Sequence, residues 1–186
     1  VVGVVEYDEL LCPKETIEPG DVLIGLPSNG LHTNGFSLVR HVFDLDSDPS
    51  PLFREYDELN GTLGKALLKP HPSYYNSLRS VLGLVKGIAH ITGGGLYENM
   101  PRILPDETTA RFHHTQWTCP PIFEIIQRRG NVATDEMFQV FNMGLGMVIV
   151  CGEGEVSPVR QNLSGSIVVG EITDDPTNSV KVSIVP

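Results

Sequence analysis

The sequence predicts an α+β protein in which helices cover a layered mixed sheet. Short apolar runs of strand length alternate with segments of helical period along the 186 residues. Hydrophobic residues make up 40% of the chain and charged residues 19%, a balance typical of a folded domain with a core. The 19 glycines and 14 prolines indicate many tight connections between elements. Because no linker divides the sequence, residues 1–186 are interpreted as one domain.

The elements follow from local patterns in chain order. Apolar runs predict strands at Val1–Glu6 and Asp21–Leu26, and Gly35–Phe43 places its apolar residues on one helical face. Asp44–Gly64 has no sustained period and predicts a mobile surface excursion. The other expected elements are a helix at Tyr74–Leu84, a strand at Lys86–Thr92, a helical pattern at Leu96–Leu104, a short strand at Thr109–His113, a helix at Ile122–Arg129 opened by Pro120 and Pro121, a helix capped by Thr134 and running through Phe141, and strands at Gly146–Cys151, Ile167–Ile172 and Val180–Val185.

Composition narrows the classes of partner. The chain has 13 Lys and Arg against 23 Asp and Glu, and its net charge of −10 disfavours nucleic acid and anionic membranes. No apolar run approaches the roughly 18 residues of a membrane helix. Cys12, Cys119 and Cys151 form no CxxC pair, so packed thiols in a reducing cytoplasm are expected rather than disulfides or a zinc site. A small phosphorylated ligand remains compatible, because backbone amides can hold an anion without positive side chains.

The first segment that can carry chemistry is Ser28–Ser37, which reads SNGLHTNGFS. It joins an expected strand to an expected helix, so unpaired amides and the positive end of the helix dipole meet there. An anion placed at this junction would find donors already pointing at it, and His32 could act as a general acid or base. The alternative is an ordinary turn in which Thr33 or Asn34 caps the helix and His32 is solvated.

The second segment is His90–Arg102, which reads HITGGGLYENMPR. Three consecutive glycines are costly in backbone entropy, so either a ligand or another chain segment must approach the backbone closely. Glu98 and Asn99 lie one turn into the next helix, where they can reach a ligand or serve as ordinary first-turn residues. Arg102 is interpreted as a surface group rather than a phosphate clamp.

The third segment, Phe141–Met147, reads FNMGLGM and lies between a helix and a strand. A dinucleotide fingerprint needs the reverse order, so a helix stop at Asn142–Gly144 is the interpretation. No phosphate-binding P-loop, HExxH or GxSxG pattern occurs. The four other histidines outside these segments show no metal-ligand spacing; they are His41, His71, His113 and His114.

Three long segments, in this order, resemble the C-terminal half of the aminoimidazole ribonucleotide synthetases, also called phosphoribosylformylglycinamidine cyclo-ligases. They read GDVLIGLPSNGLHTNGFSLVR, GIAHITGGGLYENMPRILP and W…P…F…GNVATDEMFQVFNMGLGM. The resemblance covers Val1 to about Cys151 and again Ile167–Ile172. Many other members of the superfamily carry an acidic D-x-S-D-G segment where this chain reads His90-Ile91-Thr92-Gly93-Gly94, and the glycine triplet matches the cyclo-ligase branch.

The resemblance implies a ligase of de novo purine biosynthesis that closes formylglycinamidine ribonucleotide to aminoimidazole ribonucleotide with ATP. It implies that His32 is catalytic, transferring a proton or orienting the reacting amide. It further implies a set of substrate- or nucleotide-binding residues: Thr33, Asn34, Gly35, Thr92, Gly93, Gly94, Gly95, Glu98 and Asn99. ATP and Mg²⁺ would be held mainly by an N-terminal half absent from this chain, with no metal ligand here. The intact enzyme would be a cytoplasmic homodimer and this fragment inactive alone.

The sequence departs from the family pattern at two places, and three alternative functions are considered. The family has a basic residue in a T-R/K-I-Y stretch where this chain reads His71-Pro72-Ser73-Tyr74. Gly152–Gly165 is shorter than the family's helical segment and is interrupted by Pro158, so a reduced or missing helix is expected. The alternatives are a formylglycinamidine synthase-like enzyme, a selenophosphate synthetase-like enzyme, and a non-catalytic nucleotide-binding module.

Overall fold

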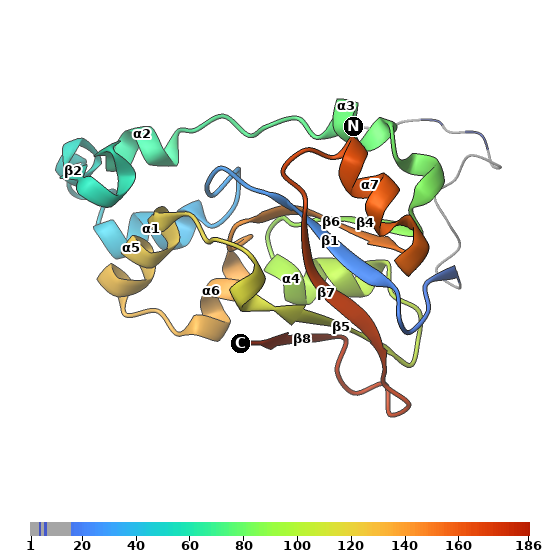
Figure 1. Cartoon of the computed structure of the whole chain (residues 1–186). Helices are drawn as coiled ribbons and strands as arrows, with labels where there is room; N and C mark the ends of the chain where they lie inside the picture. The colour runs from blue at the N-terminus through green and yellow to red at the C-terminus, as the bar shows by residue number, and fades with distance from the viewer. Residues whose placement is uncertain (1–3, 5, 7–15) are drawn as a thin grey trace.

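The computed structural model describes residues 4, 6 and 16–186, and its centre is a six-stranded sheet (Figure 1). The strand order is β4-β6-β1-β7-β5-β8, and every neighbouring pair is antiparallel except the parallel pair β5 and β8. The bounds are β1 Val22–Pro27, β4 Gly87–His90, β5 Thr108–His113, β6 Leu145–Cys151, β7 Ile167–Asp174 and β8 Val182–Val185. The expected mixed sheet is confirmed, whereas the expected strand at Val1–Glu6 lies outside the described residues.

Both faces of the sheet are buried, because successive side chains of a strand point to opposite sides. In β1, Leu23 belongs to the larger core and Ile24 to the smaller one. In β6, Val148 faces the larger core and Ile149 the smaller. The larger core includes side chains from α1 Phe36–Phe43, α4 Gly95–Asn99, α5 Pro121–Gly130 and α6 Thr134–Val140. The smaller core includes the residues around α3 Tyr75–Arg79 and α7 Val156–Asn162. The prediction of helices covering a sheet is therefore confirmed.

The segment expected to be a surface excursion holds more structure than its composition suggests. It contains the hairpin of β2 Glu55–Tyr56 and β3 Gly61–Thr62, two short 3-10 turns (Ser50–Phe53 and Asp57–Leu59), and the beginning of α2 Leu63–Leu67. Leu52, Tyr56 and Leu59 pack against the larger core. Figure 1 shows this hairpin and α2 at one end of the molecule near α1 and α5. Its apolar anchors are irregularly spaced, which is why no period marks them in the sequence.

Three helices differ from the sequence-based expectation. The helix expected at Tyr74–Leu84 stops at Arg79 and is followed by a 3-10 turn, Leu82–Leu84. The pattern at Leu96–Leu104 becomes α4 and a 3-10 turn, Met100–Arg102, because Pro101 cannot donate an α-helical hydrogen bond. Thr134 does not cap α6. The N-cap is Ala133, and the Thr134 hydroxyl instead accepts a hydrogen bond from Gln127 Nε2 at 3.1 Å.

The chain after β6 forms a 3-10 turn, Glu153–Glu155, and the seven-residue helix α7. The reduced helix expected there is present, but Pro158 does not interrupt it. Pro158 lies in the first turn, where its missing N–H removes no helical hydrogen bond.

The described cysteines are packed thiols. Cys119 is half-buried and Cys151 is buried, and both are free, while Cys12 lies outside the described residues. Burial raises the pKa of the Cys119 thiol to about 12 and that of Cys151 to about 11, so neither is a ready nucleophile at neutral pH. Within residues 4, 6 and 16–186, no helix is long and apolar enough to cross a membrane.

Candidate functional site

The sheet topology brings the three segments singled out in the sequence to one edge. β1 and β4 both pair antiparallel with β6, so they run parallel to each other and end beside the start of β6. The Ser28 amide donates to the Gly144 carbonyl at 2.8 Å, and the Ile91 amide donates to the Gly146 carbonyl at 3.0 Å. The first loop comprises residues 28–35 and the second loop residues 91–95. A Cβ added at Gly93 would lie 3.7 Å from Asn34 Oδ1, so the two glycine loops face each other.

Asn142 gives the third segment a larger role than the expected helix stop. Its side chain is buried, donates to the Gly30 carbonyl at 2.9 Å and accepts from the Ser28 hydroxyl at 2.7 Å. It also accepts from the Gly144 amide at 2.9 Å. The helix stop itself is confirmed, since α6 ends at Val140. Asn142 in addition clamps the first loop to the edge of the sheet.

His32 is buried at the centre of this edge, with 5% of its surface exposed, so the alternative of a solvated histidine is wrong. Its backbone is left-handed, with φ of 59°. Its ring stacks on that of His71, with 3.9 Å between ring centroids, and His71 lies 5.4 Å from His90. Gly146 packs against this cluster, since a Cβ there would collide with the Tyr74 hydroxyl and lie 2.9 Å from His32 Cε1.

Three buried nitrogen atoms at this edge lack a hydrogen-bond partner in the part of the chain that the structure describes. Among the described residues, neither ring nitrogen of His32 nor the side-chain amide nitrogen of Asn34 has a hydrogen-bond partner, although all three atoms are buried. Each such orphan costs about 1–3 kcal/mol. Burial, then the nearby His71 and His90, lowers the pKa of His32 to about 4, so the imidazole is neutral at neutral pH. Buried polar atoms without a protein partner are places where water or a ligand binds, so this edge is the candidate binding site.

Gly35, not Thr33 or Asn34, is the N-cap of α1, so the capping alternative is also wrong. Gly35 is left-handed, with φ of 77°, and makes no side-chain cap hydrogen bond. A Cβ at this position would collide with the Phe141 ring. Thr33 is exposed, whereas Asn34 is half-buried beside the second loop. The first loop is therefore held by its glycines and by Asn142, which leaves the His32 ring nitrogens and the Asn34 side-chain nitrogen without hydrogen bonds to described residues.

In the second loop, close packing of another chain segment and approach of a ligand explain different glycines of the triplet. Gly95 is buried, with φ of 57°, and a Cβ there would collide with the Phe138 carbonyl of α6. Close packing thus explains Gly95, and the φ of 90° explains Gly94. Gly93 is exposed and meets only Asn34, so it is the glycine free to face a ligand. Glu98 is exposed beside Gly94.

Asn99 and Thr92 fix the shape of this second loop. The buried Asn99 amide donates to the Gly95 carbonyl at 2.8 Å and to the Gly93 carbonyl at 3.2 Å. The Thr92 hydroxyl donates to Asn99 Oδ1 at 3.3 Å. Asn99 is therefore committed to the backbone of the loop.

Sequence reasoning missed His71, Tyr74 and Asn142 as parts of the site. Asn29 Nδ2 donates to the Pro70 carbonyl at 2.8 Å, which brings His71 back over His32. The Tyr74 hydroxyl donates to the Pro27 carbonyl at 2.9 Å, and burial raises the pKa of Tyr74 to about 12. The signal available in the sequence was the replacement of the family's T-R/K-I-Y stretch at residues 71–74.

The described residues do not supply a magnesium site. Across residues 4, 6 and 16–186, no group of three or more His, Cys, Asp or Glu side chains converges on a point that could hold a metal ion. The rings of His32, His71 and His90 lie near one another. However, His32 and His71 stack with 16° between their ring planes, which does not direct their nitrogens to a common centre. Any metal that accompanies a nucleotide would depend on groups outside this set.

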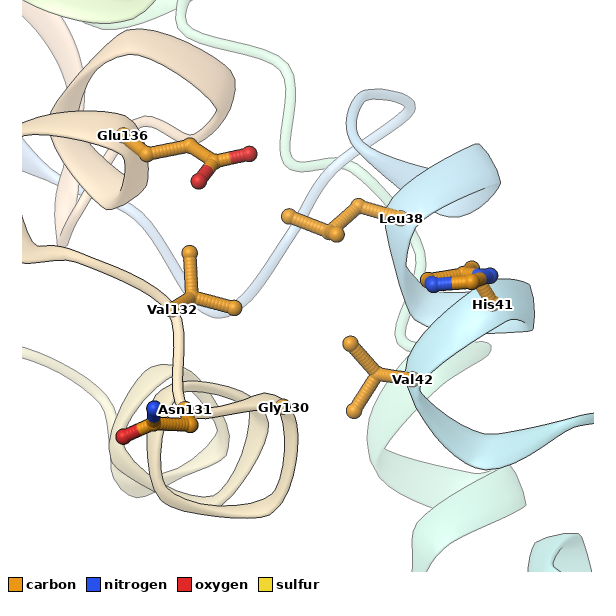
Figure 2. A pocket seen from close by; sticks show the side chains of 7 residues that line it. All are labelled: Leu38, His41, Val42, Gly130, Asn131, Val132 and Glu136. Atoms are coloured by element: carbon orange, nitrogen blue, oxygen red, sulfur yellow. The ribbon is translucent and has the colours of Figure 1, made fainter.

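A separate pocket of about 360 Å³ lies between α1 and the turn that joins α5 to α6 (Figure 2). Leu38 and Val42 of α1 face Val132 across it, and Glu136 lies at its border. None of the predicted site residues lines this pocket. The candidate site at the edge of the sheet is therefore distinct from this pocket.

The mixed six-stranded sheet, with two glycine-rich loops meeting at one edge, defines an AIR synthase-like α+β fold. Residues 18–183 match the family model described as AIR synthase related protein, C-terminal domain, and the chain belongs to this family.

The relatives agree with this assignment. The chain is 44% identical over 177 residues to a phosphoribosylformylglycinamidine cyclo-ligase of Caldicellulosiruptor saccharolyticus, covering 92% of this chain and 52% of the relative. It is 49% identical over 158 residues to the enzyme of that name from Caldicellulosiruptor bescii, covering 84% of this chain and 46% of the relative. The chain thus spans about half the length of these relatives.

A solved structure shares the fold at low identity. Hydrogenase maturation protein HypE in complex with ATP superposes with a TM-score of 0.59 at 9% identity, covering 94% of this chain and 50% of that protein.

Proposed function

We propose that this chain is the C-terminal half of an ATP-dependent cyclo-ligase that converts formylglycinamidine ribonucleotide to aminoimidazole ribonucleotide in purine biosynthesis. The relatives named for this activity support the proposal, and each is about twice the length aligned here. The observation that carries it is the set of buried, unpartnered polar atoms of His32 and Asn34 at the edge where both glycine loops meet. An N-terminal half would close this edge, and the assembled enzyme would work in the cytoplasm as a homodimer.

The reaction divides into two chemical steps. ATP transfers its terminal phosphoryl group to the formyl-derived amide oxygen, which converts a poor leaving oxygen into a phosphate. An internal nitrogen of the same molecule then attacks that carbon, the carbon–oxygen bond breaks, phosphate leaves, and the nitrogen loses a proton as the imidazole forms. Because both reacting groups belong to one molecule, the protein's task is to hold them in position and exclude water.

His32 suits the orientation of the reacting amide. Because its pKa is lowered to about 4, its ring is neutral at neutral pH and one ring nitrogen can accept a hydrogen bond, whereas it is a weak proton acceptor at that pH. In this proposal Asn34 orients the reacting amide with its free N–H group, and Thr33 contacts the ligand from the exposed side. The stack with His71 holds the His32 ring in place.

The glycine loops would hold the anionic parts of the ligands. Amides of Gly93 and Gly94, together with Gly35 at the start of the eight-residue α1, can donate to phosphate oxygens without a positive side chain. Thr92 and Asn99 would act by fixing the second loop, and Gly95 by letting it pack on α6. ATP binding is supported by the fold shared with a protein solved in complex with ATP. No step is assigned to Mg²⁺.

The test joins this chain to the first half of the Caldicellulosiruptor saccharolyticus relative and measures ATP-dependent formation of aminoimidazole ribonucleotide. We expect turnover by the joined protein and negligible turnover by this chain alone. The joined protein carrying His32→Asn should lose about tenfold or more in kcat, the scale of a lost hydrogen bond to the reacting group. Full activity after this substitution would remove His32 from the mechanism. A product that appears only with glutamine or selenide would instead favour another branch, and binding without turnover would indicate a non-catalytic module.

A further inference from the structure

A basic hollow lies at the end of the molecule that carries the β2–β3 hairpin and takes no part in the proposed reaction. Two adjacent pockets, of about 310 Å³ and 190 Å³, share Arg54, Tyr56 and Arg129 in their walls. Ile125 and Arg128 complete the first pocket. The second pocket is completed by Phe43, Ser50 and Pro51. The hollow is formed where the hairpin segment lies against the last turn of α5.

The arginines of this hollow differ in whether they form ion pairs. Arg128 forms ion pairs with Glu58 at 3.2 Å and with Glu124 at 3.7 Å. In contrast, Arg54 and Arg129 form no ion pair with any other residue that the structure describes. Two uncompensated guanidinium groups in one hollow stand out in a chain of net charge −10.

Tyr56 keeps one of these groups in place. The Arg54 guanidinium lies 5.3 Å from the centre of the Tyr56 ring, which restricts its motion without consuming its hydrogen-bond donors. The neighbouring acids Glu55 and Asp57 line neither pocket. A positioned, planar set of N–H donors is suited to the oxygens of a phosphate group.

The hollow is separate from the loops of the candidate site. α1 begins next to Gly35 in the first loop and ends at Phe43, which lines the smaller pocket. Eight helical residues span about 12 Å, so a phosphate in the hollow would not reach the first loop. The pocket of Figure 2 is a weaker candidate, because its facing walls are Leu38, Val42 and Val132 and it contains no lysine or arginine.

We propose that Arg54 and Arg129 form a second anion site that binds the phosphate group of a small phosphorylated metabolite. The phosphate lies against the two guanidinium groups, and the organic part of the molecule packs on Tyr56 and Ile125. The site needs no covalent step and does not depend on the proposed reaction.

Calorimetric titration of the full chain with inorganic phosphate and with ribose 5-phosphate tests the proposal at low ionic strength. We expect both ligands to bind and ribose 5-phosphate to bind more tightly. The double variant Arg54→Gln/Arg129→Gln should weaken both about tenfold or more, while the control Arg79→Gln/Arg160→Gln, at two exposed arginines elsewhere, should bind like the unmodified chain. Tyr56→Ala should weaken ribose 5-phosphate more than inorganic phosphate.

Three results would overturn the inference. One is equal affinity in the Arg54→Gln/Arg129→Gln variant and its control, and another is equal weakening in both, which would indicate general charge attraction. The third is loss of binding in Asn34→Ala with no loss in the arginine variant, which would place the phosphate at the candidate site and leave the proposed function standing. Because both arginines are exposed, the variants are expected to fold, and circular dichroism checks this. Should the double variant unfold, Arg129→Lys, which keeps the charge and loses the planar donors, replaces it with an expected weakening of about threefold.

Discussion

The two glycine loops at the sheet edge look alike in sequence and differ in how their polar groups are used. In the second loop, Asn99 and Thr92 are hydrogen-bonded within the loop and its first helical turn. In the first loop, the ring nitrogens of His32 and the side-chain amide nitrogen of Asn34 are buried with no hydrogen-bond partner among the described residues. The contrast indicates that internal hydrogen bonds fix the conformation of the second loop. The first loop instead has donors and acceptors free to bind a ligand.

The largest effect on stability is expected from a substitution that disrupts the packing of the second loop. Gly95→Ala forces a Cβ into the Phe138 carbonyl at a φ of 57°, so α4 and α6 must separate. We expect a loss of about 3 kcal/mol or more in the free energy of unfolding, measured with urea. Gly83→Ala, where a Cβ would meet nothing within 4 Å, is the matched control and should change stability by less than about 0.5 kcal/mol. Equal stability of the two variants would contradict the packing role of Gly95.

The second largest effect on stability is expected when Asn142, which holds the first loop to the edge of the sheet, is replaced. Asn142→Ala leaves the Ser28 hydroxyl and the Gly30 carbonyl without their buried partner, and should cost about 2–3 kcal/mol in the free energy of unfolding. The exposed Asn76→Ala on α3 serves as the control and should have little effect. If Asn142→Ala unfolds at the same urea concentration as the control, the loop does not depend on Asn142.

The third effect concerns pH and follows from the buried state of His32. Its pKa falls from 6.5 to about 4 on folding, so between these values the unfolded chain binds more protons than the folded one. Stability is therefore full above about pH 6.5 and declines as the pH falls toward 4. His32→Asn, which tolerates the left-handed backbone, should reduce this decline by roughly 1–2 kcal/mol. Parallel stability curves of the two proteins from pH 7 to 4 would argue against a buried neutral imidazole.

The smallest effect on stability is expected at Asn34, where the effect on ligand binding is large. Asn34→Ala removes a buried amide nitrogen that has no described partner, so the free energy of unfolding should not fall and should rise by up to about 1 kcal/mol. Affinity of the joined protein for formylglycinamidine ribonucleotide should fall about tenfold, measured by calorimetry. Ser37→Ala, three residues away and exposed, is the control and should keep the affinity of the unmodified joined protein. A strongly destabilised Asn34→Ala protein with normal affinity would reverse the interpretation.

Local pattern predicted much of the fold and part of the site. The strands β1, β6 and β7 follow from apolar runs, and the position of the loops follows from the glycines that come shortly after β1 and β4. The pairing of β4 and β1 with β6 has no local signal, and this pairing is what unites the three segments. The stack of His71 on His32 depends on the path of a segment without a period, fixed by the contact of Asn29 with Pro70.

Nuclear magnetic resonance of the joined, nitrogen-15-labelled protein tests the use of the first loop most directly. On titration with formylglycinamidine ribonucleotide, the side-chain amide of Asn34 and the ring nitrogens of His32 should shift at saturation, and the Asn99 side-chain amide should move much less. Saturable binding that moves Asn99 and leaves Asn34 and His32 unchanged would contradict the account.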